Sequence, residues 1–108
     1  MPSRKVEFQT GHYYHIYNRG NNRQLIFFER ENYLFFLRKL REYLVNNAVE
    51  VVAYCLMPNH YHLLVYINSD DISNLMQAFT LSYTKAINKR YKRVGSLFHS
   101  SFPGYPRR

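Results

Sequence analysis

Hydrophobic and polar residues follow two different periods along this chain, one near two residues and one near 3.6. The segment 12–17 is rich in Tyr and His, and the segment 51–56 is a continuous apolar run of strand length. After Pro58-Asn59, a dipeptide that favours a tight turn, the segment 60–67 is again rich in strand-forming residues. These three segments predict β-strands, and the turn predicts that the second and third form a hairpin.

Two other segments have the helical period. The first begins near Glu29 and ends at Asn46-Asn47, and the second follows the capping residues 68–71 and ends before Gly95. Each carries an apolar stripe at steps of three and four residues, which would face a core. The stripes comprise Tyr33, Phe36, Leu37, Leu40, Tyr43 and Leu44 in the first helix and Ile72, Leu75, Met76, Phe79, Tyr83, Ala86 and Ile87 in the second. The segment 96–102 then predicts a fourth strand.

The resulting order, β-α-β-β-α-β, is the ferredoxin-like arrangement of an α+β fold. We expect a four-stranded antiparallel sheet with the strand order 4-1-3-2 and both helices on one face. A chain of 108 residues fits one domain over residues 12–102, with a frayed N-terminus over 1–11 and a tail over 103–108.

The charge of the chain points to a polyanionic partner. Fifteen Lys and Arg against seven Asp and Glu give a net charge of +8, a strong field for a small domain. The eleven Tyr residues also suit surfaces that stack bases. No apolar run approaches the ~20 residues of a membrane span, and no signal peptide opens the chain. Its one cysteine, Cys55, is expected to be a buried thiol in a cytoplasmic protein.

His60 and His62 form the clearest candidate for a chemical site. Residues two apart on a strand share a face and lie about 7 Å apart, so the two imidazoles could bind one divalent metal ion. The alternative is a pair of polar side chains on a solvated sheet face. His15, in the first strand, is expected on the same face and is a geometric candidate for a third ligand.

Two groups of residues are candidates for contact with DNA. Asn18, Arg19 and Arg23 lie in the turn-rich segment after the first strand, where a solvated loop is the alternative. The second group ends the second helix, where cations would also complement the helix dipole. It comprises Lys85, Lys89, Arg90, Lys92 and Arg93.

The order of these motifs resembles the single-tyrosine transposases with a His-hydrophobic-His metal motif, in particular the REP-associated branch of the insertion-sequence type. The matching pieces lie between residues 12 and 102 and occur in the family's order. They are His15-Ile16-Tyr17-Asn18-Arg19-Gly20, the segment 53–64 with Met57-Pro58-Asn59-His60-Tyr61-His62, Ser82-Tyr83-Thr84-Lys85 with Asn88-Lys89-Arg90, and Gly95-Ser96-Leu97-Phe98.

This resemblance implies DNA transposition on single-stranded or hairpin DNA. In that family both histidines bind Mg²⁺ or Mn²⁺, and a tyrosine attacks the scissile phosphate to leave a 5′-phosphotyrosine and a free 3′-OH. A phenol with a pKa near 10 is a weak nucleophile and a phosphodiester is an anion, so a divalent cation that offsets the developing charge is needed.

The family's nucleophile and third metal ligand belong to a helix beyond the fourth strand, and residues 103–108 do not resemble that helix. The nucleophile is therefore expected beyond Arg108, and we expect a C-terminally truncated transposase domain that binds DNA without cleaving it. No residue of the chain is assigned as the nucleophile; Tyr83 and Tyr91 match structural positions, and Tyr105 is the fallback.

Two alternative functions follow from the same residues. An RRM-like, non-catalytic module that binds nucleic acid would share the topology, although the aromatic RNP signature of that class is absent. A small-molecule metalloenzyme would require at least three protein ligands. A homodimer could also form if the sheet edge at the predicted fourth strand paired with a second copy.

Overall fold

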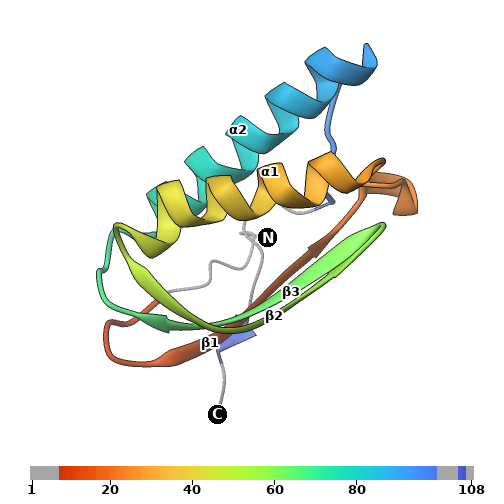
Figure 1. The fold of residues 1–108 in the computed structure, drawn as a ribbon. Helices are drawn as coiled ribbons and strands as arrows, with labels where there is room; N and C mark the ends of the chain where they lie inside the picture. Colours follow the sequence, from red (N-terminus) through yellow and green to blue (C-terminus); the bar gives the residue numbers. More distant parts are fainter. Residues whose placement is uncertain (1–7, 100–104, 107–108) are drawn as a thin grey trace, which may run out of the picture.

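Two helices lie on the same side of an antiparallel sheet, and together they form an α+β fold (Figure 1). The structure is a computed structural model that describes residues 8–99 and, for the backbone alone, residues 105–106. Its elements are β1 (Tyr13–Arg19), the 3-10 turn η1 (Asn21–Arg23), α1 (Arg30–Leu40), the π-helical turn η2 (Arg41–Val45), β2 (Val49–Met57), β3 (His60–Ile67), α2 (Ile72–Tyr91) and β4 (Tyr105–Pro106).

Strand β3 lies inside the sheet, and its residues alternate between two environments. Tyr61, Leu63, Val65 and Ile67 are fully buried, whereas the residues between them are partly exposed. This alternation is the two-residue repeat of a strand with one face on a core. The sheet therefore has a buried face toward the helices and an open face.

The strands are ordered β2-β3-β1-β4, with β3 antiparallel to both β1 and β2. The predicted hairpin and the three long strands are thus confirmed. The prediction of a fourth strand over residues 96–102 is wrong in its described part, because Phe98 forms only a single bridge with Gly20. Leu97 and Phe98 are both buried, so this segment enters the core instead of alternating. Residues 100–102 lie outside the described residues, and β4 pairs with β1 at this edge.

Both predicted helices form, and local capping explains where they begin and end. Glu29 and Asn32 make a capping box at the start of α1, and the Asn32 side chain also accepts the Phe28 backbone N–H at 2.7 Å. The first helix continues through η2 to Asn46, as predicted. The second ends where Lys92 adopts a left-handed φ of 55°. No helix within the described residues is long and apolar enough to cross a membrane.

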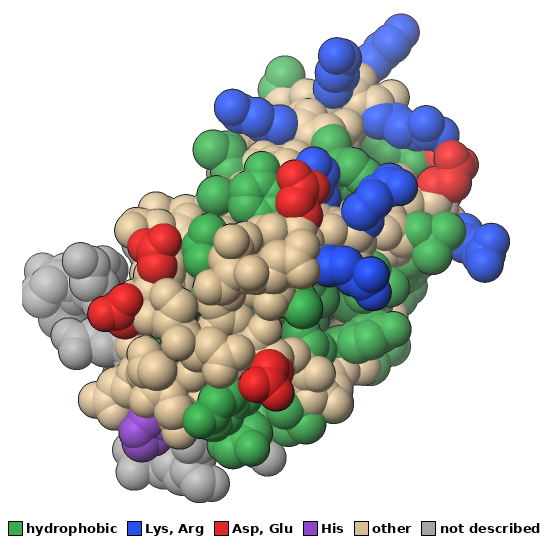
Figure 2. Space-filling view, turned by 60° about the vertical axis from the view of Figure 1, so that its left-hand side comes forward, with side chains coloured by type: hydrophobic (Ala, Val, Ile, Leu, Met, Phe, Trp, Pro, Cys, Tyr) green, Lys and Arg blue, Asp and Glu red, His purple; other side chains and the backbone are tan. Residues whose placement is uncertain are grey.

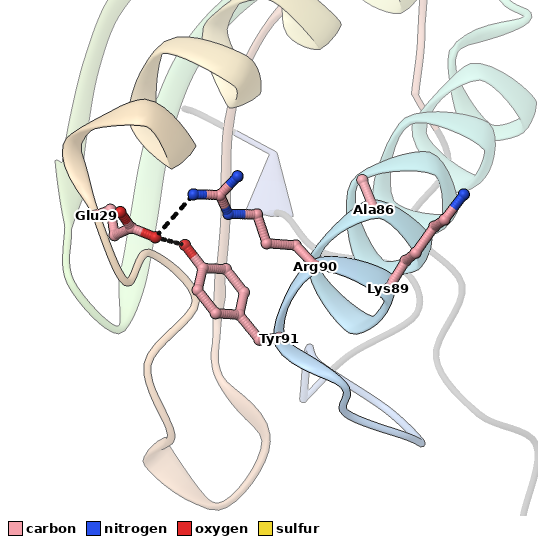
Figure 3. Close-up of a pocket in the computed structure, with 5 residues that line it drawn as sticks. All are labelled: Glu29, Ala86, Lys89, Arg90 and Tyr91. Atoms are coloured by element: carbon pink, nitrogen blue, oxygen red, sulfur yellow. Dashed lines mark hydrogen bonds and ion pairs between the residues drawn. The ribbon is translucent and has the colours of Figure 1, made fainter.

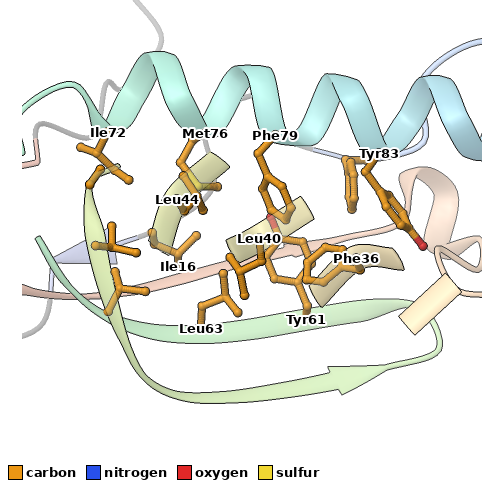
Figure 4. Close-up of a cluster of buried hydrophobic side chains, with 14 of the residues drawn as sticks. Ile16, Phe36, Leu40, Leu44, Tyr61, Leu63, Ile72, Met76, Phe79 and Tyr83 are labelled. Carbon is orange, nitrogen blue, oxygen red and sulfur yellow. The ribbon is translucent and has the colours of Figure 1, made fainter. Parts of the chain in front are cut away.

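The core lies between the helices and the buried face of the sheet (Figure 4). The Phe36 ring is central, with ring centroids at 5.0 Å from both Phe79 and Tyr61. Most residues of both predicted apolar stripes are buried or packed against this core. The core residues labelled in Figure 4 come from the sheet and from both helical segments: Ile16, Phe36, Leu40, Leu44, Tyr61, Leu63, Ile72, Met76, Phe79 and Tyr83.

A bulge between Val51 and Ala53 changes which residues of β2 face the helices. Beyond it, Cys55 pairs with His62 and is exposed, so the expectation of a buried thiol is wrong. A continuous apolar run shows neither a bulge nor a position at the edge of a sheet, and the exposure of Cys55 could therefore not be predicted from the sequence.

Two buried tyrosines in this core differ in how their hydroxyls are satisfied. Tyr83 donates its O–H to the Ile26 carbonyl at 2.6 Å. The Tyr61 hydroxyl has no hydrogen-bond partner among the described residues. Burial raises the pKa of the Tyr61 phenol far above its ordinary value, and the nearby Asn18 side chain opposes this only in part.

We expect Tyr83→Phe to lower the free energy of unfolding by roughly 1 kcal/mol or more, because it leaves the buried Ile26 carbonyl without its partner. Tyr61→Phe should leave the stability unchanged or raise it slightly, because it removes a buried hydroxyl that makes no bond. Urea denaturation of both variants measures the difference. A loss in Tyr61→Phe equal to that in Tyr83→Phe would contradict this assignment.

Candidate functional site

The first residue of β3 and the last residue of β1 lie side by side on the open face. His60 pairs with Arg19, and His62 pairs with Tyr17. Paired residues of antiparallel strands share a face, and the buried Tyr61 between the two histidines fixes both of them on the open side. The expectation that His60 and His62 share a face is therefore confirmed.

The two imidazoles are close, and each has one ring nitrogen engaged. Their ring centroids are 5.3 Å apart with nearly perpendicular planes. His60 Nδ1 lies 2.9 Å from Asn59 Oδ1, and since that oxygen only accepts, Nδ1 is the donor. His62 Nδ1 lies 2.8 Å from His15 Nε2. The Nε2 atom of His60 then keeps a lone pair for a ligand. The Nε2 atom of His62 does the same when the His62 ring donates its proton through Nδ1.

His15 is brought to the pair as the sequence suggested, but its contact with His62 is a hydrogen bond between rings. The His15 and His62 rings are stacked, with centroids 5.0 Å apart. Within residues 8–99, no group of three His, Cys, Asp or Glu side chains is arranged to hold a metal ion. The geometry thus gives two candidate ligands, His60 and His62, and places His15 as the partner that orients His62.

The loop after β1 supports the turn that presents His60. The Gly20 N–H donates to the Asn59 carbonyl at 2.9 Å, and the N–H groups of Ile26 and Phe27 donate to the Pro58 carbonyl at 2.9 and 3.1 Å. A Cβ atom on Gly20 would lie 1.9 Å from the Gln24 carbonyl oxygen, so only glycine fits there. Sequence reasoning treated Gly20 as a turn residue and missed this role, since the contact joins segments far apart in the chain.

The three loop residues predicted to contact DNA have different positions. Arg19 is exposed on the open face next to His60. Arg23 is exposed in a left-handed conformation with φ of 59°. Asn18 is only 3% exposed and accepts the Arg19 N–H, so its side chain is turned toward the core rather than toward a ligand.

The basic residues at the end of α2 form a patch at the top of the molecule, as Figure 2 shows. Two of them are held by protein groups. Arg90 lies 3.3 Å from Glu29 and 3.6 Å from Glu31, and Arg93 donates to the side chains of Asn88 and Gln24.

The remaining three, Lys85, Lys89 and Lys92, are exposed and make no ion pair with any described carboxylate. At steps of four and three residues they follow one side of the helix and its cap.

A shallow hollow beside this patch is lined by Glu29, Ala86, Lys89, Arg90 and Tyr91 (Figure 3). Tyr91 and Arg90 both reach Glu29, while Lys89 points away from it. The hydrogen bond from Tyr91, followed by that from Arg90, lowers the pKa of the Glu29 carboxyl. These contacts join the end of α2 to the start of α1, so Arg90 has a structural role that the sequence did not reveal.

The predictions about the catalytic nucleophile fall on the C-terminal end of the chain. Arg108, beyond which the family's nucleophile is expected, lies outside the described residues, so that expectation stays a prediction. Tyr105, the fallback nucleophile, is described by its backbone alone, which pairs with His15 in β1. The described residues therefore assign no nucleophile to the histidine pair.

Comparisons with known proteins agree with the geometry. The model of a family described as "Transposase IS200 like" matches residues 8–103. Among solved structures, the chain is similar to a REP-associated tyrosine transposase bound to a REP hairpin, with a TM-score of 0.75 and 15% sequence identity. That match covers 100% of this chain and 63% of the other, and at this identity it shows the fold. No curated protein matches the chain.

The pKa of His62 is lowered by burial first and then by the charges of His15 and His60. We therefore expect its NMR titration midpoint below the ordinary value of about 6.5, and His15→Gln should raise it only partway because burial remains. The unfolded chain then binds this proton more readily, so His62 lowers the free energy of unfolding as the pH falls below about 6.5. A midpoint at or above 6.5, or one that His15→Gln leaves unchanged, would disprove this account.

Proposed function

This chain belongs to the family of IS200-like transposases, and we propose that it binds single-stranded or hairpin DNA where β1 ends and β3 begins. The observation that carries the proposal is the shared position of His60, His62 and Arg19 on one open face. A cation and two ligand nitrogens at one end of a sheet can hold a phosphodiester there.

We further propose that His60 and His62 hold a Mg²⁺ or Mn²⁺ ion through their Nε2 atoms. The pair fits such an ion because its Nδ1 atoms are already bonded to Asn59 and His15. Two imidazoles suit Mn²⁺ better than Mg²⁺, which prefers oxygen ligands, so the remaining positions would be filled by water or DNA oxygens. When bound, the ion would offset negative charge on the scissile phosphate.

The DNA backbone would be held by Arg19, Arg23 and the three exposed lysines at the end of α2 and its cap, Lys85, Lys89 and Lys92. The bridge between Phe98 and Gly20 joins the segment after α2 to the loop after β1, so both basic groups lie toward the same end of the molecule. Arg90 and Arg93 would contribute charge while remaining bonded to protein groups. Such contacts to phosphates give affinity without reading much sequence.

Strand cleavage requires a tyrosine placed in line with the phosphate, within about 3.5 Å. Tyr83 is buried and bonded to Ile26, and Tyr91 is bonded to Glu29, so neither can serve without leaving its partner.

Tyr105 is then the remaining tyrosine to test, since its backbone lies beside β1. A strand of two residues gives little support for in-line geometry. We propose that this chain binds DNA without cleaving it, because Tyr83 and Tyr91 are engaged by protein groups and the short strand β4 gives Tyr105 little support.

We also propose a four-stranded sheet and a homodimer for this chain. The position of β4 beside β1 supports a ferredoxin-like, four-stranded sheet in one domain, and because β4 is Tyr105–Pro106 this domain would extend beyond residues 12–102 into the predicted tail. The edge strand β2, on the opposite side of the sheet from the predicted fourth strand, exposes Val52, Tyr54 and Met57, so a homodimer would form through β2 instead of the predicted edge. The RRM-like alternative without a metal is favoured by one observation, the aromatic side chains on the open face.

Replacing Lys85, Lys89 and Lys92 together by Ala should weaken binding to a labelled DNA hairpin and reduce the slope of log affinity against log salt by roughly 2 to 3 units, about 0.7 for each lost contact to a single strand or about 0.9 for each lost contact to the duplex stem. Fluorescence anisotropy between low and moderate salt measures both quantities. Lys39→Ala is the matched control, because Lys39 is paired with Glu42 at 3.3 Å on α1. A triple variant with an unchanged slope would show that this patch does not contact DNA.

Incubation of the chain with labelled hairpin DNA and Mn²⁺ should give no covalent band on a denaturing gel, because Tyr83 and Tyr91 are bonded to Ile26 and Glu29 and a two-residue strand gives Tyr105 little support for in-line attack. Tyr105→Phe and Tyr83→Phe are run beside the unaltered chain. A band that disappears in Tyr105→Phe would contradict the expectation and assign Tyr105 as the nucleophile. A band lost only in Tyr83→Phe would assign that role to Tyr83.

A further inference from the structure

Two tyrosines form a second feature of the open face, far from the histidine pair along the strands. Tyr13 and Tyr66 are register partners at the opposite ends of β1 and β3 from Arg19 and His60. Their rings meet edge to face, with centroids 5.1 Å apart. Tyr13 is 51% exposed and Tyr66 is partly exposed, so neither ring is needed to fill the core. The proposed function gives them no role.

A run of aromatic rings connects these tyrosines to the histidine pair. On β1, His15 and Tyr17 follow Tyr13 on the same face at steps of two residues, about 6.6 Å each. The His15 and Tyr17 ring centroids are 5.0 Å apart, and Tyr17 stacks on His62 with centroids 5.8 Å apart. A sheet face with rings along its central strands is the kind of platform on which unpaired bases stack.

The charges on this face distinguish its two ends. Arg19 lies at the end with His60, where a phosphate would be attracted. Glu50 is exposed and pairs with Tyr66, so the tyrosine end carries a carboxylate beside the rings. A carboxylate repels a phosphate but accepts hydrogen bonds from the amino groups of bases. The tyrosine end therefore suits a base and the Arg19 end suits the backbone.

We propose that the Tyr13–Tyr66 pair stacks a base of single-stranded DNA, with the base on the face of one ring and the other ring supporting it edge to face, and that this strand extends from the histidine pair along β1 toward the other end of the open face. This inference rests on the proposed function, because it assigns a place to the unpaired strand next to the hairpin or phosphate held at His60 and His62. Base stacking of this kind tolerates any sequence, since every base has a π-face. The face thus selects single strands over duplex.

Binding of a fluorescent single-stranded oligonucleotide to the full chain tests the proposal. Tyr13→Leu and Tyr66→Leu, which keep an apolar side chain without the ring, should each weaken binding by about 5- to 150-fold while the salt slope stays unchanged. Tyr13→Phe and Tyr66→Phe should bind like the unaltered chain. Tyr54→Leu is the matched control, because Tyr54 is a 55% exposed tyrosine that pairs with Leu63 on the other face.

Thermal unfolding midpoints of the Leu and Phe variants confirm that each is folded, and an oligonucleotide with abasic sites provides the second measurement. The unaltered chain should lose affinity for the abasic strand, whereas the Leu variants should bind both strands alike.

If the unaltered chain binds with a steep salt slope but the Leu variants bind equally well, the stacking inference is overturned and the proposed function stands. If the unaltered chain binds neither single-stranded nor hairpin DNA, the stacking inference and the proposed function are both overturned. Tighter binding of the matching RNA would overturn the assignment to DNA, and loss of self-association in the Leu variants without loss of DNA binding would assign this face to a second copy.

Discussion

The strict alternation of β3 is the constraint on which the site depends. Tyr61, Leu63, Val65 and Ile67 are all fully buried, and a shift of the strand register by one residue would move this set to solvent. That shift would also carry His60 and His62 into the core, where two polar rings would lack partners. The free energy of burying the apolar set thus fixes the direction of the histidines, and the same alternation in β1 places His15 and Arg19 beside them.

The turn before β3 adds a second constraint that acts through the backbone alone. Carbonyl groups of Pro58 and Asn59 accept N–H groups from the loop after β1, and that loop is also bridged to Phe98 after α2. Three segments that are distant in the chain therefore meet where β3 begins, at His60. Gly20 permits this approach because a side chain there would collide with the Gln24 carbonyl. Ligand positions held on strands and braced by backbone bonds are better fixed than positions on a free loop.

Periodicity predicted the elements that bury a full stripe or face, and failed where the chain departs from a regular repeat. The two helices, the hairpin and the common face of His60 and His62 follow from the sequence because each satisfies one period over several turns or residues. The bulge near Val52 and the path of Leu97 and Phe98 could not be predicted from the sequence, since both depend on tertiary contacts. The same limit applies to Asn18, which the fold buries, and to Arg90, whose partner Glu29 comes from the start of α1, although both residue types suit DNA.

The open face combines chemistry that a core-facing surface could not tolerate. Its Arg19 end brings together a cation and two imidazoles whose Nδ1 atoms are already committed, and its other end brings together two tyrosine rings and Glu50. A nucleic acid strand has a charged backbone on one side and flat, weakly polar bases on the other, so a surface with a cation at one end and tyrosine rings beside a carboxylate at the other can orient it. Duplex DNA presents phosphates on its outside and hides the base faces, and it could use only the Arg19 end. Under the proposed function, this face would therefore favour a junction between paired and unpaired DNA, which is the structure at the foot of a hairpin.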